Sequence, residues 1–195
     1  MHIAVLGDTG MVGSRAVAEA KHRGHQVTGY SRHGENPLDF AETAKVVDII
    51  NNPEVDLTII AVVTGRTGSY ADDVANHKAL IEAAPTGRML VVGGAGALQA
   101  DDNTLLVDAP DFPEAYKAES QTFVEVHNMY EQSNGLNWTM LAPAPEIAPG
   151  ERTGEYQVAK DHPAGRFISA EDFAVALIDE AENPQHTGTR FTVAN

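Results

Sequence analysis

Short apolar runs alternate with amphipathic stretches along the whole chain. The apolar runs are typical of buried strands and cover residues 2–7, 25–30, 56–63, 88–94, 136–143 and 189–194. The stretches between them predict helices that end near residue 23, span 41–51, 70–84 and about 113–132, and begin after Ser169. Strands that alternate with helices predict a doubly wound α/β fold, a mainly parallel sheet with helices on both faces. We expect one domain over residues 1–195, with substrate-side elements within about 143–170.

Local signals refine two helix starts and one edge of the predicted sheet. Asp111 is placed to cap the helix whose first turn contains Pro113, and Ser169 with Asp172 has the spacing of a capping box. Between Arg32 and residue 41 lies only "HGENPLDF", which is too short and polar for a strand with its own crossover helix. The sheet is therefore predicted to have a truncated third-strand edge beyond residues 25–30.

The segment "GDTGMVGS" places three glycines between the first predicted strand and the first predicted helix. Gly7 permits a tight turn, Gly10 lets the backbone approach a pyrophosphate, and Gly13 allows close packing of helix on sheet. The helix that follows adds free N–H groups and a positive dipole end. A glycine triplet alone is weak evidence and a structural turn is the alternative. Its place between strand and helix favours a Rossmann-type dinucleotide site.

The residues after the second strand bear on the choice of coenzyme. Domains that bind NAD usually carry an acid there to accept from the ribose 2′-hydroxyl, whereas this chain has "YSRHG". Arg32 suits a 2′-phosphate, which a guanidinium can hold through two parallel hydrogen bonds. An exposed surface arginine is the alternative reading. We predict a preference for NADP(H) over NAD(H), with Ser31 and His33 as further contacts.

Composition excludes several other classes of function. The chain has 28 acidic and 13 basic residues, a net charge of −15, which disfavours a nucleic-acid partner. It contains no cysteine, and no apolar run approaches the roughly 20 residues that span a bilayer. The eight histidines show no ligand spacing, so no metal site is expected. The amino-terminal residues read as a strand rather than a signal peptide, which predicts a cytoplasmic protein without membrane contact.

Several longer segments carry a family resemblance. The glycine spacing, Arg32, "LVVGGAGAL", "NWTMLAPAPEIAPGERTGEY" and "ISAEDFAVALIDEAENPQHTGTRFTV" resemble the atypical short-chain dehydrogenases/reductases. Within these the chain is similar to the NAD(P)H-binding, NmrA-like group described as NADH-flavin reductases, to which biliverdin reductase B (flavin reductase) is related. The resemblance implies a dinucleotide across the carboxyl ends of the strands and hydride delivery to a flavin or another flat acceptor.

The resemblance also implies a set of coenzyme contacts. Those near the phosphates and adenosine are Gly7, Thr9, Gly10, Met11, Val12, Arg32, Asp39, Phe40, Ala61, Val62, Val63 and Thr64. Those near the nicotinamide and its acceptor are Gly93, Gly94, Pro145, Glu146 and Ile147. Biliverdin reductase B has Ser where Gly94 stands and His where Glu146 stands, which argues against tetrapyrrole reduction.

Tyr156 and Lys160 have the spacing of the proton relay of short-chain dehydrogenases. In those enzymes the pair lies on the helix before the strand at 136–143, but here it follows that strand. The helix at 113–132 contains Tyr116 and Tyr130 without a lysine four residues later. We therefore interpret the Tyr156 spacing as coincidental and expect no relay. Glu146, Tyr116 and Arg66 are the ionisable or hydroxylic candidates near the expected mouth of the site.

These features predict an NAD(P)H-dependent oxidoreductase that transfers hydride from NADPH to a flavin or quinone, with positioning as the main source of catalysis. The remaining proton can come from solvent. A non-catalytic NADP(H)-binding sensor of the NmrA type is the alternative. A sugar-nucleotide epimerase or dehydratase is less favoured because the relay is missing. The expected partner is a flat small molecule, and the protein is expected to be a monomer or homodimer.

Overall fold

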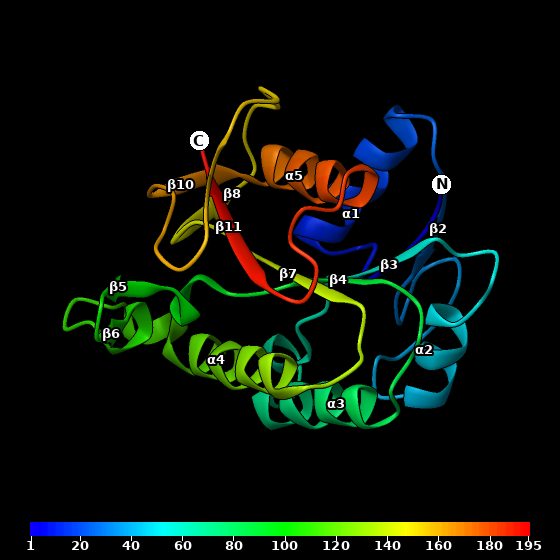
Figure 1. The fold of residues 1–195 in the computed structure, drawn as a ribbon, viewed down its shortest axis with the longest axis horizontal. Helices are drawn as coiled ribbons and strands as arrows, with labels where there is room; N and C mark the ends of the chain where they lie inside the picture. Colours follow the sequence, from blue (N-terminus) through cyan, green and yellow to red (C-terminus); the bar gives the residue numbers. More distant parts are fainter.

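A seven-stranded sheet forms the centre of the computed structural model, which describes residues 1–195 (Figure 1). Its strands are β1 (His2–Leu6), β2 (Gln26–Tyr30), β3 (Leu57–Ile60), β4 (Met89–Val92), β7 (Trp138–Ala142), β9 (Gln157–Ala159) and β11 (Arg190–Ala194). The strand order is β2-β1-β3-β4-β7-β11-β9, and only β9 runs antiparallel to its neighbour. The predicted doubly wound, mainly parallel α/β fold is confirmed.

Helices cover both faces of the sheet (Figure 1). On one face lie α1 (Met11–His22) and α5 (Ala170–Glu182), and on the other α2 (Thr43–Ile50), α3 (Tyr70–Glu82) and α4 (Lys117–Gln132). Alternation along β1 sends Ile3 and Val5 into the core beneath α1 and α5, and Leu6 into the core on the other side. Each such side chain is at most 2% exposed, and its burial contributes about 1.5–3 kcal/mol. The two apolar cores hold the carboxyl ends of the strands in place.

The sheet ends at β2, which agrees with the predicted truncation of the edge beyond the second strand. After Tyr30 the backbone makes one isolated bridge between Ser31 and Pro37 and no further strand. Leu38 and Phe40 then turn inward, are 7% and 6% exposed, and join the core on the α2 and α3 side. The short segment therefore forms a loop that folds back over the end of β2.

Several short strands were not predicted from the hydrophobic periodicity of the sequence. β8 (Glu146–Ala148) pairs in parallel with β10 (Phe167–Ser169), and β5 (Gln99–Asp101) forms a hairpin with β6 (Thr104–Leu105). β9 extends the main sheet by only three residues. Runs of two or three residues are too short to show an alternation, and tertiary contacts decide whether they pair.

The predicted start of one helix is wrong in detail. α4 begins at Lys117 after a 3-10 turn at Glu114–Tyr116, and its N-cap is Tyr116 rather than Asp111. After Pro113 the chain forms the tighter 3-10 turn before the α-helix begins. Asp111 is therefore too far along the chain from the first α-helical N–H groups to cap them.

The capping box at the start of α5 is half formed. Ser169 Oγ accepts from the Asp172 N–H at 3.0 Å, as predicted. The Asp172 carboxylate does not return to Ser169 but accepts from the N–H groups of Thr153 and Gly154 at 2.9 and 2.8 Å. Asp172 is fully buried, so it satisfies the loop before β9 instead of its own helix.

Candidate functional site

The turn between β1 and α1 brings the helix unusually close to the sheet. Gly7 has φ +88°, and a methyl group there would lie 2.3 Å from the carbonyl oxygen of Ala61 on the neighbouring β3 connection. A methyl group at Gly13 would lie 2.1 Å from the carbonyl oxygen of Gly7. Both positions therefore exclude any larger residue, and the amino end of α1 sits directly over the turn.

The amino end of α1 carries no side-chain cap. Its N-cap is Gly10, and its first turn contains no acidic residue. By contrast, Ser69 and Ser169 cap α3 and α5 through their hydroxyl groups. The N–H groups of the first turn of α1 are thus left for another acceptor, at the positive end of the helix dipole. This is the arrangement that binds a phosphate group.

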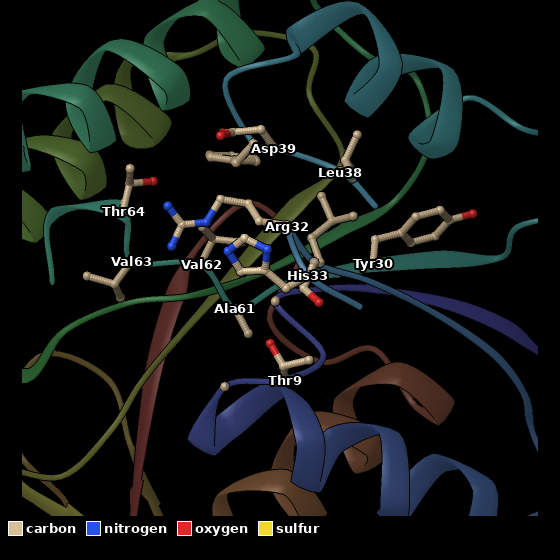
Figure 2. A pocket seen from close by; sticks show the side chains of 15 residues that line it. Thr9, Tyr30, Arg32, His33, Leu38, Asp39, Ala61, Val62, Val63 and Thr64 are labelled. Atoms are coloured by element: carbon tan, nitrogen blue, oxygen red, sulfur yellow. The ribbon is translucent and has the colours of Figure 1, made fainter. Parts of the chain in front are cut away.

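A cavity of about 200 Å³ opens beside this helix end, at the carboxyl ends of β1, β2 and β3 (Figure 2). Its lining comes from the glycine turn, the loop after β2 and the connection after β3. The lining residues are Leu6, Gly7, Thr9, Gly10, Tyr30, Ser31, Arg32, His33, Leu38, Asp39, Phe40, Ala61, Val62, Val63 and Thr64. Because its lining includes most of the residues expected near the adenosine, we call it the adenosine cavity.

Most residues predicted near the adenosine and phosphates are brought together in this cavity. Met11 and Val12 are the exceptions, since they begin α1 beside it without lining it. Leu6, Tyr30 and Leu38 line the cavity and were missed. Leu6 and Tyr30 are the last residues of their strands, and that position at the carboxyl edge was the available signal.

Arg32 stretches across the cavity from the loop after β2 (Figure 2). Its Nη2 donates to Oγ1 of Thr67 at 2.8 Å, in the loop that follows β3. No carboxylate pairs with the Arg32 guanidinium. Ser31 lines the same cavity, and its buried Oγ has no hydrogen-bond partner within the protein. The rim of the cavity therefore offers one unpaired cation and one free hydroxyl.

The loop that carries Thr64 is anchored from below by α3. Asp73 is fully buried and its carboxylate accepts from the N–H groups of Thr64 and Gly65 at 2.6 and 2.7 Å. Arg66 in the same loop forms a two-point ion pair with Glu119 of α4, at 2.8 and 2.6 Å. The bonds to Glu119 raise the pKa of Arg66. Arg66 is thereby committed to joining two elements of the fold.

The other two catalytic candidates lie on different elements. Tyr116 precedes α4 and is 64% exposed. Glu146 begins β8, where its side chain is exposed and its N–H donates to the carbonyl oxygen of Arg166 at 3.0 Å. Neither residue lines the adenosine cavity.

The residues expected at the nicotinamide follow β4 and β7, which continue the carboxyl edge beyond β3. Gly93 donates its N–H to Leu141 at 2.9 Å, and Gly94 lies against the ring of Phe123 in α4. Pro145 and the β8 residues Glu146 and Ile147 follow β7. These residues lie outside the adenosine cavity but on the same edge of the sheet.

Tyr156 makes its hydrogen bond on the α1 and α5 side of the sheet. Its hydroxyl donates to Asp179 Oδ2 in α5 at 2.6 Å, and burial together with this contact raises the pKa of Tyr156. Lys160 is exposed and forms no ion pair. Tyr130 is fully buried and bonded to His77 at 3.1 Å; burial raises the pKa of Tyr130 and lowers that of His77 to about 4.

Comparison with known proteins identifies a family. Residues 7–184 match the model of a family described as NAD(P)H-binding. This match confirms the resemblance to NAD(P)H-binding proteins that the glycine spacing and the carboxy-terminal segments indicated.

Three solved structures superimpose on the whole fold with a TM-score of 0.88 each. A candidate exported protein from Burkholderia pseudomallei is 35% identical, with all of both chains covered. A candidate NADH-flavin reductase from Streptococcus pneumoniae is 29% identical over 100% of this chain and 99% of its own. A candidate epimerase from Bacteroides thetaiotaomicron is 30% identical over 99% and 96%.

The helices and the acidic and histidine side chains bear on the predictions of membrane and metal binding. None of the helices combines the length and the apolar content that crossing a membrane requires. No group of three or more histidine, aspartate or glutamate side chains is placed to hold a metal ion.

Proposed function

The chain belongs to the NAD(P)H-binding family, and on this premise we propose that it is an NADPH-dependent reductase of a flat small-molecule acceptor, a flavin or a quinone. One observation carries the proposal. The uncapped amino end of α1 lies beside a cavity whose rim presents an unpaired arginine in the place where NAD-binding domains have an acid. A cytoplasmic location, where NADPH is supplied, goes with this role.

The glycine turn and the start of α1 would hold the pyrophosphate. Thr9 and Gly10 line the cavity at this helix end, and the N–H groups of Met11 and Val12 begin the helix. Unpaired N–H groups and the helix dipole together favour two negative charges here. The close packing at Gly13 keeps these groups rigid before the ligand arrives.

Arg32 would select the phosphorylated coenzyme. Its guanidinium is unpaired apart from one hydrogen bond to a neutral hydroxyl, so a 2′-phosphate gains a charge-assisted contact without breaking an ion pair. Ser31 and His33 line the same rim and would add hydrogen bonds. Asp39 and Phe40 would border the adenine, since both line the cavity.

The carboxyl ends of β3, β4 and β7 would guide the rest of the coenzyme along the sheet edge. Asp73 fixes the backbone at Thr64, so Ala61, Val62, Val63 and Thr64 form a firm track past the ribose. Gly93 and Gly94 would border the nicotinamide after β4, and Pro145, Glu146 and Ile147 would contact the acceptor. When bound, the reduced nicotinamide would supply a hydride to the acceptor, and the protein would supply orientation and a site that limits water.

No tyrosine is assigned a role as proton donor. Tyr156 is bonded to Asp179 on the α5 face and Tyr130 is buried against His77. Reduction of a flavin or quinone needs no tyrosine and lysine pair, because solvent can supply the remaining proton. This absence disfavours alcohol oxidation and the chemistry of epimerases.

The test is the loss of NADPH absorbance with FMN, riboflavin and a small quinone as acceptors. We expect turnover with at least one of them, and a higher kcat/KM for NADPH than for NADH. Titration calorimetry with both coenzymes runs in parallel. No heat and no rise in melting temperature with either coenzyme would refute the proposal.

A non-catalytic NADP(H) sensor is the second candidate, because the unassigned proton donor suits binding without turnover. It predicts a calorimetric signal with NADPH and no oxidation with any acceptor. The same pair of measurements therefore separates the reductase from the sensor. An epimerase would instead act on a sugar nucleotide without net loss of NADPH.

A further inference from the structure

A carboxylate stands in the β1–α1 turn between Gly7 and Thr9, which line the cavity that the proposed coenzyme would occupy, although it is not itself a lining residue. Asp8 follows Gly7 in the β1–α1 turn, and its N–H donates to the carbonyl oxygen of Tyr30 at 3.4 Å. A methyl group built on Gly29 would lie 2.3 Å from Asp8 Oδ2, and one on Gly34 would lie 3.4 Å from Oδ1. The Asp8 carboxylate therefore occupies space that is open because Gly29 and Gly34, which precede and follow Arg32 in the chain, have no side chains.

This carboxylate is not neutralised by the protein. Asp8 Oδ1 is buried and accepts no hydrogen bond, and Asp8 belongs to none of the ion pairs. Ser31 Oγ is also buried without a partner, and a methyl group on Gly34 would lie 2.5 Å from it. Arg32 follows Ser31 directly in the chain, but its guanidinium donates to Thr67 instead. Two unsatisfied polar oxygens thus lie close together at the adenosine end, where the cost of leaving them unpaired calls for a ligand partner.

The two charges at this end of the cavity favour different coenzymes. A ribose 2′-hydroxyl can donate a hydrogen bond to a carboxylate, which is how acids after the second strand recognise NADH in related folds. A 2′-phosphate has no hydrogen to donate at neutral pH and is repelled by a carboxylate. Arg32 attracts the phosphate from the other side of the loop. The coenzyme preference is then expected to be the difference between the two effects.

We propose that Asp8 is a specificity-determining residue of the coenzyme site. It accepts a hydrogen bond from the 2′-hydroxyl of NADH and opposes the 2′-phosphate of NADPH, so the preference that Arg32 sets for NADPH stays modest and both coenzymes are used. Ser31 serves either ligand, because its hydroxyl can donate to a phosphate or accept from a ribose. This inference rests on the proposed function, since it concerns the same coenzyme site.

The test compares Asp8→Asn with the wild type. The substitution keeps the shape and removes the charge, so we expect the ratio of kcat/KM for NADPH to that for NADH to rise about tenfold. Asp39→Asn is the matched control: it removes a carboxylate from the adenine wall of the same cavity, and we expect it to change both coenzymes by the same factor. A ratio within twofold of the wild type for Asp8→Asn overturns the inference.

A binding measurement gives a second readout without catalysis. Calorimetry with adenosine 2′,5′-bisphosphate and with 5′-AMP isolates the effect of the 2′-phosphate, and Asp8→Asn is expected to tighten only the bisphosphate, about tenfold. If Asp8→Asn does not fold, Asp8→Ala gives the same comparison with a smaller side chain. Binding of both coenzymes with an unchanged ratio overturns the role of Asp8 alone, whereas no binding of either overturns the proposed function together with it.

Discussion

Charged side chains gather at both ends of α1, and the two groups differ in how their polar atoms are paired. Near the carboxyl end, Glu19 is 5% exposed and accepts from both Arg23 and Arg152. Arg23 also binds Asp179 and Glu182 of α5. Near the amino end, Asp8 has no partner, Arg32 has one neutral partner, and the helix has no cap.

The difference separates groups that hold the fold from groups that await a ligand. Burial alone would lower the pKa of Arg23, but its bonds to carboxylates outweigh burial and raise it. Because these side chains satisfy one another's hydrogen bonds, none of them is left to bind a ligand. Their contacts join α1, α5 and the loop before β9. Unpaired groups at the other end cost stability and are tolerated where a ligand completes them. Tyr156, whose spacing to Lys160 resembles a proton relay, belongs to the paired end.

The largest effect is expected at the paired end, for Glu19→Ala. This change leaves Arg23 with a lost partner in a largely buried site, and we expect the free energy of unfolding to fall by about 3 kcal/mol. Urea unfolding followed by circular dichroism measures it. Glu42→Gln, which removes an exposed carboxylate paired with Lys45, is the control and should leave the melting temperature unchanged. A stable Glu19→Ala protein would show that the network contributes little.

The same residue predicts a pH dependence of stability. Hydrogen bonding to Arg152, opposed by burial and reinforced by Arg23, lowers the pKa of Glu19 from 4.5 to about 2. Because the folded pKa is the lower one, this stabilisation is present above about pH 4.5 and is lost as the pH falls toward 2. Glu19→Gln should flatten the fall in unfolding free energy over that interval. An unchanged slope would assign the acid sensitivity to other carboxylates.

The next largest effect is expected at the unpaired end, for Arg32→Ala. Loss of a charge-assisted contact should raise KM for NADPH about tenfold or more, with KM for NADH changed less than about twofold. Stability should stay within about 0.5 kcal/mol, since Arg32 makes one exposed hydrogen bond. Arg152→Ala is the matched control and should lower the melting temperature while leaving both KM values alone. Equal effects of Arg32→Ala on both coenzymes would reject its assignment.

A smaller effect is expected for Tyr156→Phe. The change removes the hydrogen bond to Asp179 and should cost about 1 kcal/mol of unfolding free energy. The kcat with NADPH and a flavin should be unchanged, because the hydroxyl lies on the α5 face. A drop in kcat of tenfold or more, at full folding, would restore the proton-relay interpretation of Tyr156 and Lys160.

The smallest effect is expected for Thr67→Val. Without this hydroxyl the Arg32 guanidinium loses the one partner that competes with a 2′-phosphate, so KM for NADPH should fall about twofold. The KM for NADH serves as the internal control and should not move. A rise in KM for NADPH would mean that Thr67 holds Arg32 in its productive orientation.

Much of the fold and one half of the site followed from local patterns. The sequence predicts the parallel strands to within a few residues of their observed bounds. Strands that are buried on both faces appear in a sequence as unbroken apolar runs, and this made them recognisable. Gly7 and Gly13 indicated the phosphate turn, since only glycine tolerates the close approaches found there. Arg32 was recognisable because it follows the second strand, where this topology places the residue that contacts the adenosine ribose.

Three kinds of feature did not follow from the sequence. The pairs β8 with β10 and β5 with β6 are too short to leave a period. The partners of Asp172 lie in a loop nineteen positions away and at the chain end, so its role in a capping box looked complete from local spacing alone. Leu38 lies in a segment whose sequence indicates a polar loop, and only the structure shows that Leu38 and Phe40 are both buried in the core.

The sequence by itself determined the alternation of strands and helices, the glycine turn and the position of Arg32, because these depend on residues close together in the chain. Only the tertiary structure decided which charges are paired. Glu19 meets Arg152 across 133 positions, whereas Asp8 enters a hollow beside β2 and meets no cation. Pairing over such separations is set by how the crossover connections bring elements side by side, and no spacing along the chain encodes it.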